Sequence, residues 1–84
     1  MARRVVVWST TARAELRAID RETARQILEG IDRYLETGAG DVKKLQPPRR
    51  EFRLRIGEYR VLFLRVDSQT IEVLRVRHRS KAYR

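Results

Sequence analysis

Apolar and basic residues alternate along residues 52–63, with the two-residue period of a β-strand. Gly57 and Glu58 interrupt the alternation, and a Gly in the first position of a two-residue connection is typical of a type II′ hairpin turn. The pattern therefore predicts two antiparallel strands over about residues 51–56 and 59–66. Their predicted register pairs Ile56 with Tyr59 and Arg55 with Arg60.

This predicted hairpin separates its side chains by chemistry, because successive residues of a strand point to opposite faces of a sheet. A third strand over residues 71–77, joined by residues 67–70, extends the pattern. We expect the apolar face to form the core with Phe52, Leu54, Ile56, Tyr59, Val61, Phe63, Leu74 and Val76. The other face, called the arginine face below, gathers Arg53, Arg55, Arg60, Arg75 and Arg77. Like charges on one surface repel, so this grouping indicates a role other than stability.

The same pairing predicts an apolar zone at the far end of the arginine face. Its members are Leu62, Leu64, Val66, Ile71 and Val73. An exposed aliphatic patch beside a polar rim is typical of a protein interface. We therefore expect this zone to be covered either by a segment of another chain or by another part of this one.

The first half of the chain predicts a short strand and two helices. Residues 4–8 are mostly β-branched and aromatic, as strands are. A first helix is expected to begin at the hydroxyl cap of Ser9 and to run to about Ile19. A second helix is expected to begin at Asp20 and to end at Gly38, which can adopt the left-handed conformation of a helix stop.

Together these elements predict an α+β fold in a single domain over residues 1–84. The expected order is β-α-α-β-β-β, with a two-helix hairpin packed on one face of a mostly antiparallel four-stranded sheet. Residues 42–45 are a candidate for one further short element. A chain of 84 residues is long enough for one modest core and too short for two.

The charge of the chain is concentrated in its second half. The net charge is +9, and residues 43–84 carry 13 Lys and Arg against 4 Asp and Glu, whereas residues 1–42 carry 7 of each. Such a basic region is the electrostatic footprint of a protein that binds a polyanion, most often nucleic acid. The alternative is that solvated arginines serve solubility alone.

Composition also excludes several classes of protein. The chain has no Cys and one His, so disulfides and a Cys nucleophile are excluded and a metal site is not expected. The apolar run at residues 5–8 is far shorter than a membrane span. We expect a cytoplasmic protein without a cofactor and without a membrane partner.

Three segments together resemble the RelE/ParE toxin superfamily, and closest is its RelE-type mRNA interferase branch. They are residues 41–45, residues 53–61 and residues 78–84, and they occur in the family's order. The resemblance covers nearly the whole chain and implies a RelE-like fold. It also implies the toxin of a type II toxin–antitoxin pair, neutralised by a small acidic antitoxin that wraps around it. The predicted apolar zone is the expected contact surface of that antitoxin.

The resemblance further implies a set of site residues. The candidate catalytic residues are Arg53, Arg60, Arg77 and Tyr83. Further candidates for binding RNA phosphates are Lys43, Lys44, Arg55, Arg79 and Lys81. Glu51 stands where the RelE pattern has a second lysine, and both Glu51 and His78 are candidate acid or base groups. The tyrosine could instead anchor the C-terminal segment, and the histidine could be a simple surface residue.

The function implied is a ribosome-dependent endoribonuclease that cleaves mRNA in the A site by 2′-OH attack, without a metal. Its partners would be the antitoxin, the mRNA and ribosomal RNA. The alternative on the same fold is not enzymatic: a ParE-like inhibitor of DNA gyrase or a basic RNA-binding module. The departure at Glu51 favours this alternative, whereas the joint presence of Arg60, Arg77 and Tyr83 favours the nuclease.

Overall fold

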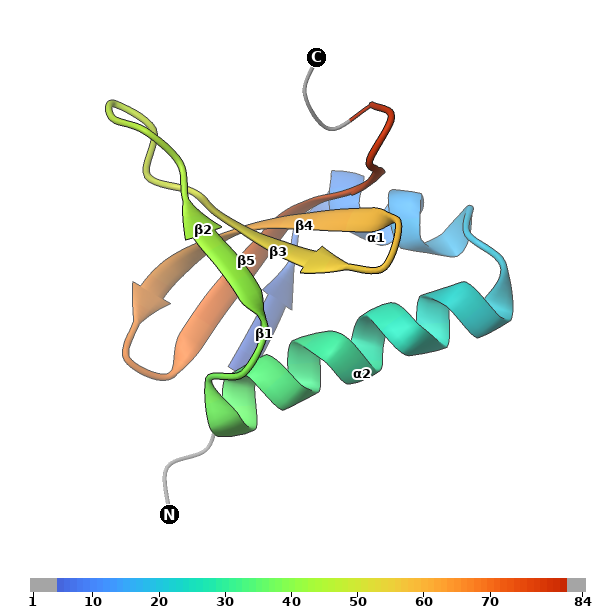
Figure 1. The fold of residues 1–84 in the computed structure, drawn as a ribbon, viewed down its shortest axis with the longest axis horizontal. Helices are drawn as coiled ribbons and strands as arrows, with labels where there is room; N and C mark the ends of the chain where they lie inside the picture. The colour runs from blue at the N-terminus through green and yellow to red at the C-terminus, as the bar shows by residue number, and fades with distance from the viewer. Residues whose placement is uncertain (1–4, 82–84) are drawn as a thin grey trace.

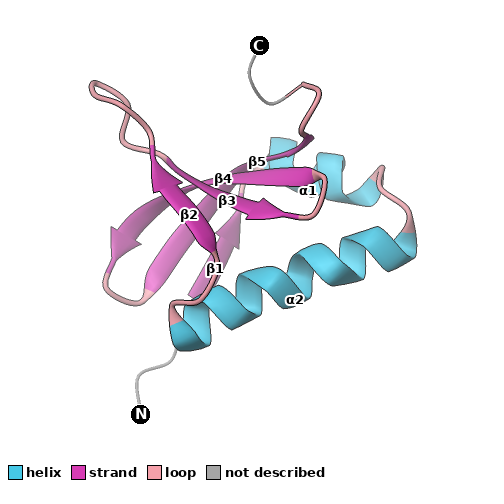
Figure 2. Cartoon of the chain, in the orientation of Figure 1, coloured by secondary structure: helices cyan, strands magenta, loops and turns pink. Residues whose placement is uncertain are grey.

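The computed structural model describes residues 5–81, in which two helices pack against a five-stranded sheet (Figures 1 and 2). The elements are β1 (Val5–Trp8), α1 (Thr10–Arg17), α2 (Arg21–Thr37), β2 (Asp41–Lys44), β3 (Phe52–Ile56), β4 (Tyr59–Asp67) and β5 (Thr70–His78). The α+β class is as expected. No helix in this described part is long and apolar enough to cross a membrane.

The sheet has the strand order β1-β5-β4-β3-β2, so the first strand lies beside the last. β1 pairs with β5 in parallel, and every other neighbouring pair is antiparallel. The expectation of four strands was wrong by one, because β2 pairs with β3 along its whole length. The candidate element at residues 42–45 is thus a true edge strand.

The hairpin of β3 and β4 has the predicted register. Ile56 lies opposite Tyr59, and Arg55 lies opposite Arg60. Gly57 has a φ of 57°, and no residue other than Gly has a positive φ in the described chain. This conformation at the first turn position, and only there, is what a type II′ turn requires.

The pairing of β4 with β5 differs from the prediction beyond Leu62. Arg75 lies opposite Leu62 as expected, but Val73 lies opposite Phe63, which leaves Leu74 as an extra residue in β5. A bulge of this kind turns the residues beyond it to the other face. Ile71, at 5% exposed, and Val73, at 0%, are therefore core residues and do not belong to the exposed apolar zone. Leu74, predicted in the core, is only half-buried.

Both helices begin at their predicted caps, and α2 also ends where predicted. The Ser9 hydroxyl accepts a hydrogen bond from the Ala12 N–H, and the Asp20 carboxylate accepts one from the Thr23 N–H. Gly38 closes α2 with a φ of 76°. α1 is shorter than predicted and ends at Arg17.

The core lies between α2 and one face of the sheet (Figure 1). The helix contributes Ile27, Ile31, Tyr34 and Leu35, and the strands contribute Leu54, Val61, Phe63, Ile71, Val73 and Val76. Gly30 brings α2 close to β3, because a Cβ at this position would stand 2.7 Å from Cδ1 of Ile56. In the part of the chain that the structure describes, α2 leaves the opposite face of the sheet uncovered, and the arginines lie on that face.

Candidate phosphate-binding face

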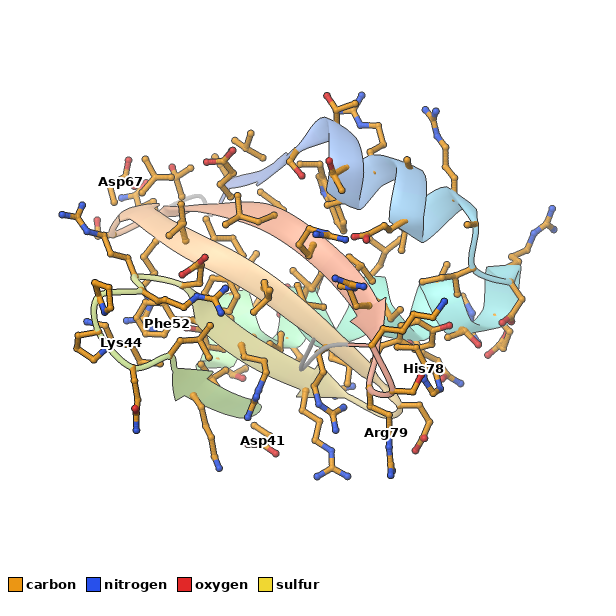
Figure 3. The ribbon with its side chains drawn as sticks, turned by 90° about the horizontal axis from the view of Figure 1, so that it is seen from above. Asp41, Lys44, Phe52, Asp67, His78 and Arg79 are labelled. Carbon is orange, nitrogen blue, oxygen red and sulfur yellow. The ribbon has the colours of Figure 1, made fainter. Side chains whose placement is uncertain are left out.

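Cross-strand pairing arranges the arginine face in two rows. Figure 3 looks onto this side of the sheet, with α2 behind it. One row runs across β2, β3, β4 and β5 as Asp41, Arg55, Arg60 and Arg77. The next row runs as Lys43, Arg53, Leu62 and Arg75. All five predicted arginines therefore share one face, and Lys43 joins them.

Arg60 is buried at the centre of the first row. Arg60 is 7% exposed, and one terminal nitrogen of its guanidinium donates hydrogen bonds of 3.1 Å to the carbonyl oxygens of Gly57 and Tyr59. Within residues 5–81 no carboxylate forms an ion pair with Arg60. Burial of a guanidinium without an anion is costly, so this group is prepared to receive one.

Arg55, the cross-strand neighbour of Arg60 on β3, has a weak carboxylate contact. Arg55 is exposed, and its guanidinium stands 4.0 Å from the Asp41 carboxylate in a pair that is itself more than half exposed. Such a surface pair contributes little and is screened by salt. Arg77 and Arg53 are half-buried. The centre of the face therefore combines a fixed arginine with flanking arginines that can approach a ligand.

Glu15 of α1 lies at the β5 end of the second row. Its Oε2 accepts hydrogen bonds from Nε and a terminal nitrogen of Arg75, at 3.1 and 2.8 Å, and its Oε1 accepts one of 2.7 Å from the Val76 N–H. Burial alone would raise the pKa of Glu15. The hydrogen bonds from Arg75 and Val76, with the charges of Arg75 and Arg77, more than offset this and hold the pKa below its ordinary value.

The other predicted phosphate-binding residues lie at the margins of this face or away from it. Lys44 points to the helix side, where its Nζ stands 5.8 Å from the centre of the Phe52 ring. Figure 3 shows Lys44 and Phe52 at the end of the sheet opposite to His78 and Arg79. Arg79 forms an exposed pair with Glu58 at 3.6 Å. Lys81 is exposed just beyond β5.

The candidate acid and base groups do not meet in the arginine rows. His78 pairs with Tyr59 across the strands, and its ring packs edge-on against the Tyr59 ring at 5.4 Å. With Tyr59 it lines a pocket of about 320 Å³ on the α2 side. Glu51 precedes β3 and pairs with Arg49 at 3.2 Å, and this hydrogen bond lowers the pKa of Glu51. Tyr83 lies outside the described residues.

The exposed apolar zone is smaller on β5 than predicted and extends onto β1. Leu62 and Leu64 are half-buried on the arginine side of β4, and Val66 is 60% exposed. Val5 and Val7 of β1, which were not among the predicted members of the zone, are also exposed. The all-apolar run at residues 5–8 gave no alternation from which to assign their face. The parallel pairing places Val7 beside Glu72, which in turn lies opposite Leu64.

Potential metal ligands are dispersed over the described chain. No group of three or more His, Asp or Glu side chains among residues 5–81 is arranged to hold an ion. The chemical capacity of the arginine face is therefore that of its guanidinium groups, which donate paired hydrogen bonds to phosphate or carboxylate oxygens.

Two helices on one face of a mixed, mostly antiparallel sheet, with arginines on the other face, are what the RelE/ParE toxin superfamily leads one to expect, and the comparisons show that the chain belongs to it. Residues 6–83 match the family model described as "ParE toxin of type II toxin-antitoxin system, parDE". The chain therefore belongs to the ParE toxin family and is the toxin of a type II toxin–antitoxin system. None of the curated proteins matches it significantly.

Solved structures of toxin–antitoxin complexes have the same fold. The RelBE2 complex of Mycobacterium tuberculosis matches with 27% identity and a TM-score of 0.72, over 92% of this chain and 99% of that one. The RelE–RelB complex of Pyrococcus horikoshii OT3 matches with 25% identity and a TM-score of 0.72, over 98% and 100%. The chromosomal ParDE system of P. aeruginosa matches in fold, with 19% identity and a TM-score of 0.63, over 90% and 95%.

Proposed function

We propose that this toxin is a ribosome-dependent endoribonuclease that cleaves mRNA in the A site. The observation that supports the proposal best is Arg60, a buried guanidinium flanked by Arg55 and Arg77 and without a carboxylate partner in the described chain. Phosphate is the anion that such a group of guanidinium forks fits in RNA.

In the proposed reaction the 2′-OH attacks the adjacent phosphorus in line. A bond forms between the 2′-oxygen and phosphorus, the bond from phosphorus to the 5′-oxygen breaks, and negative charge builds on the phosphoryl oxygens. Arg60 and Arg77 are the groups proposed to stabilise that charge. Removal of one preorganised donor of this kind commonly costs about 10²–10³ in rate.

The proton transfers need two further steps: a base takes the proton of the 2′-OH, and an acid returns one to the leaving 5′-oxygen. Tyr83 is our candidate for the base, because neighbouring cations favour a phenolate. Glu51 and His78 are the competing candidates, although both have other partners in the described structure. The ribosome would position the mRNA, which supplies a large part of such a rate enhancement.

The partner proposed for the same face is a cognate antitoxin, as in the toxin–antitoxin complexes named above. Leu62, Leu64 and Val66 are the predicted antitoxin contacts that remain exposed or half-buried. An acidic partner segment would meet the arginine rows beside them. Such a segment would neutralise the toxin by occupying the phosphate-binding face.

Inhibition of DNA gyrase is the second candidate, and the match to the ParE family favours it. In that case the arginine face would bind a protein or DNA surface without chemistry. A basic module that only binds RNA is the third candidate. All three candidates use the same face. Only the nuclease breaks a phosphodiester bond, and the other two differ in whether the face binds gyrase or RNA.

Primer extension on mRNA in a translating extract would test the proposal. The wild type should produce cuts inside A-site codons, and Arg60→Ala and Tyr83→Phe should reduce them at least about 10²-fold if both residues act in the reaction. Arg21→Gln is the matched control, because it removes an exposed arginine from α2.

Each outcome distinguishes the candidates. Cuts that survive in the Arg21 variant and vanish in the other two support a nuclease with this site. Growth arrest without cuts, together with inhibited supercoiling by purified gyrase, would reject the nuclease and establish the second candidate. RNA binding without cuts and without any effect on gyrase would establish the third.

A further inference from the structure

The outer edge of β5 is covered by a strand along only half of its length. β1 ends at Trp8, opposite Val73, so the N–H and C=O groups of β5 beyond Val73 have no strand on that side. α1 replaces the missing strand. The Ser9 hydroxyl donates to the Leu74 carbonyl oxygen at 2.9 Å, and the Glu15 carboxylate accepts from the Val76 N–H.

The other oxygen of the Glu15 carboxylate accepts hydrogen bonds from Arg75. Oε2 binds Arg75 through two nitrogens, and the Glu15 side chain is only 23% exposed. By comparison, the pair of Arg55 and Asp41 on the same face is longer, at 4.0 Å, and more exposed. Glu15 therefore holds one arginine of the second row firmly against α1.

We propose that Glu15 is a positioning residue that withholds Arg75 from RNA and so limits how many phosphates the arginine face engages. This inference rests on the proposed function, because it assumes that the face binds RNA. A carboxylate and a phosphate offer the same pair of acceptor oxygens to a guanidinium, so the two anions compete for Arg75. The carboxylate is already fixed by Val76, and Arg75 stays with it.

The proposal requires that Arg75, although on the arginine face, contributes no phosphate contact while Glu15 is ionised and bonded to it. Its neighbours Arg60 and Arg77 then form the working centre of the face. Neutralising Glu15 would release Arg75 toward RNA and add one contact. A contact of this kind is measurable, because the logarithm of the binding constant falls with the logarithm of salt by about 0.7 per phosphate contact for single strands.

The experiment is a cycle of four proteins: wild type, Glu15→Gln, Arg75→Ala and the double variant. Each is titrated with a fluorescent single-stranded RNA oligonucleotide at several salt concentrations. Glu15→Gln removes the charge but keeps an oxygen that can accept from Val76, so the edge of β5 keeps its partner. Thermal unfolding of each protein accompanies the titrations.

The expected result is a steeper salt dependence, by about 0.7, for Glu15→Gln alone, with tighter binding at low salt. The salt slope of Arg75→Ala should equal that of the wild type. The slope of the double variant should also equal it, because the arginine that Glu15→Gln would release is then absent. A purely structural role of Glu15 would weaken binding in Glu15→Gln and would leave the slope unchanged.

The proposal is overturned if Glu15→Gln has the wild-type slope. It is also overturned if Arg75→Ala has a slope about 0.7 lower than the wild type, because Arg75 would then already contact RNA. The latter comparison stands even if Glu15→Gln fails to fold. If the wild type binds this RNA without salt dependence, RNA binding by the arginine face is rejected altogether. If Arg60→Ala loses RNA binding and Glu15→Gln has no effect, only the proposed role of Glu15 is rejected.

Discussion

The face of the sheet that α2 covers and the arginine face are built from alternating residues of the same strands, yet they are completed in different ways. On the covered face, Val61, Phe63 and Val73 are fully buried by α2 and by one another. On the arginine face, Arg60 is buried beside further cations and without a carboxylate partner in residues 5–81. The first face stabilises the fold, and the second reduces stability through repulsion.

This difference teaches which substitutions should separate stability from function. Changes on the covered face should alter the free energy of unfolding and leave the ligand-binding behaviour of the folded protein intact. Changes on the arginine face should do the opposite. Phe63→Ala and Gly30→Ala change the covered face, whereas Arg55→Gln changes the arginine face and Glu15→Gln changes the partner of one of its arginines.

The largest expected effect is that of Phe63→Ala. Phe63 is 0% exposed and packs against the rings of Tyr34 and Phe52, with ring centres 5.4 and 5.5 Å apart. We expect the free energy of unfolding to fall by about 3–5 kcal/mol, measured by urea denaturation. A folded Phe63→Ala protein that has lost salt-dependent RNA binding would contradict the division.

Gly30→Ala should have a smaller effect on the same face. The added Cβ would stand 2.7 Å from Cδ1 of Ile56, and we expect this crowding to outweigh the gain in helix propensity, for a net loss of roughly 1 kcal/mol. Ile56→Val removes that Cδ1 atom. The double variant should therefore be more stable than the sum of the two single changes, as measured by a double-mutant cycle.

Arg55→Gln should leave stability almost unchanged and weaken RNA binding. Arg55 is exposed, and its pair with Asp41 is long. The free energy of unfolding should change by less than about 0.5 kcal/mol. The salt slope of RNA binding should fall by about 0.7, whereas Arg21→Gln on α2 should leave it unchanged. Equal effects of both variants would indicate binding by net charge alone.

The smallest expected effect concerns acid stability. The pKa of Glu15 is lowered in the folded protein, so the folded state binds fewer protons than the unfolded state as pH falls below the ordinary value of 4.5. The stabilising effect of ionised Glu15 is present above that value and is lost as pH falls through the lowered pKa. The stability difference between wild type and Glu15→Gln should therefore shrink on acidification, whereas a constant difference would contradict this account.

The sequence was sufficient to predict the hairpin at Gly57, because turn chemistry and alternation agree there. It failed beyond Leu62, because a bulge changes which residues face the core without changing the local pattern. A signal was present at Glu72: strict alternation with Leu74 and Val76 would place this acidic residue on the core face, whereas the bulge moves it to the other face. An acidic residue in a predicted core is a reason to shift the register.

The candidate site divides in a similar way. Alternation was sufficient to group the five arginines, because it depends only on local geometry. The partner of Arg75 could not be predicted, because Glu15 is 60 residues away in sequence and reaches β5 only through the packing of α1. Lys44 is adjacent to Lys43 in sequence and therefore points to the other face of the sheet, where it lies near Phe52.

The parallel pairing of β1 with β5 has a consequence for biosynthesis. β5 lies between β1 and β4, so β1 has no partner in the sheet until residues 70–73 have been made. The first arginine row lacks Arg77 until β5 is nearly complete. A growing chain therefore has no finished arginine face, and this face is completed only when the last strand has been translated and has inserted between β1 and β4.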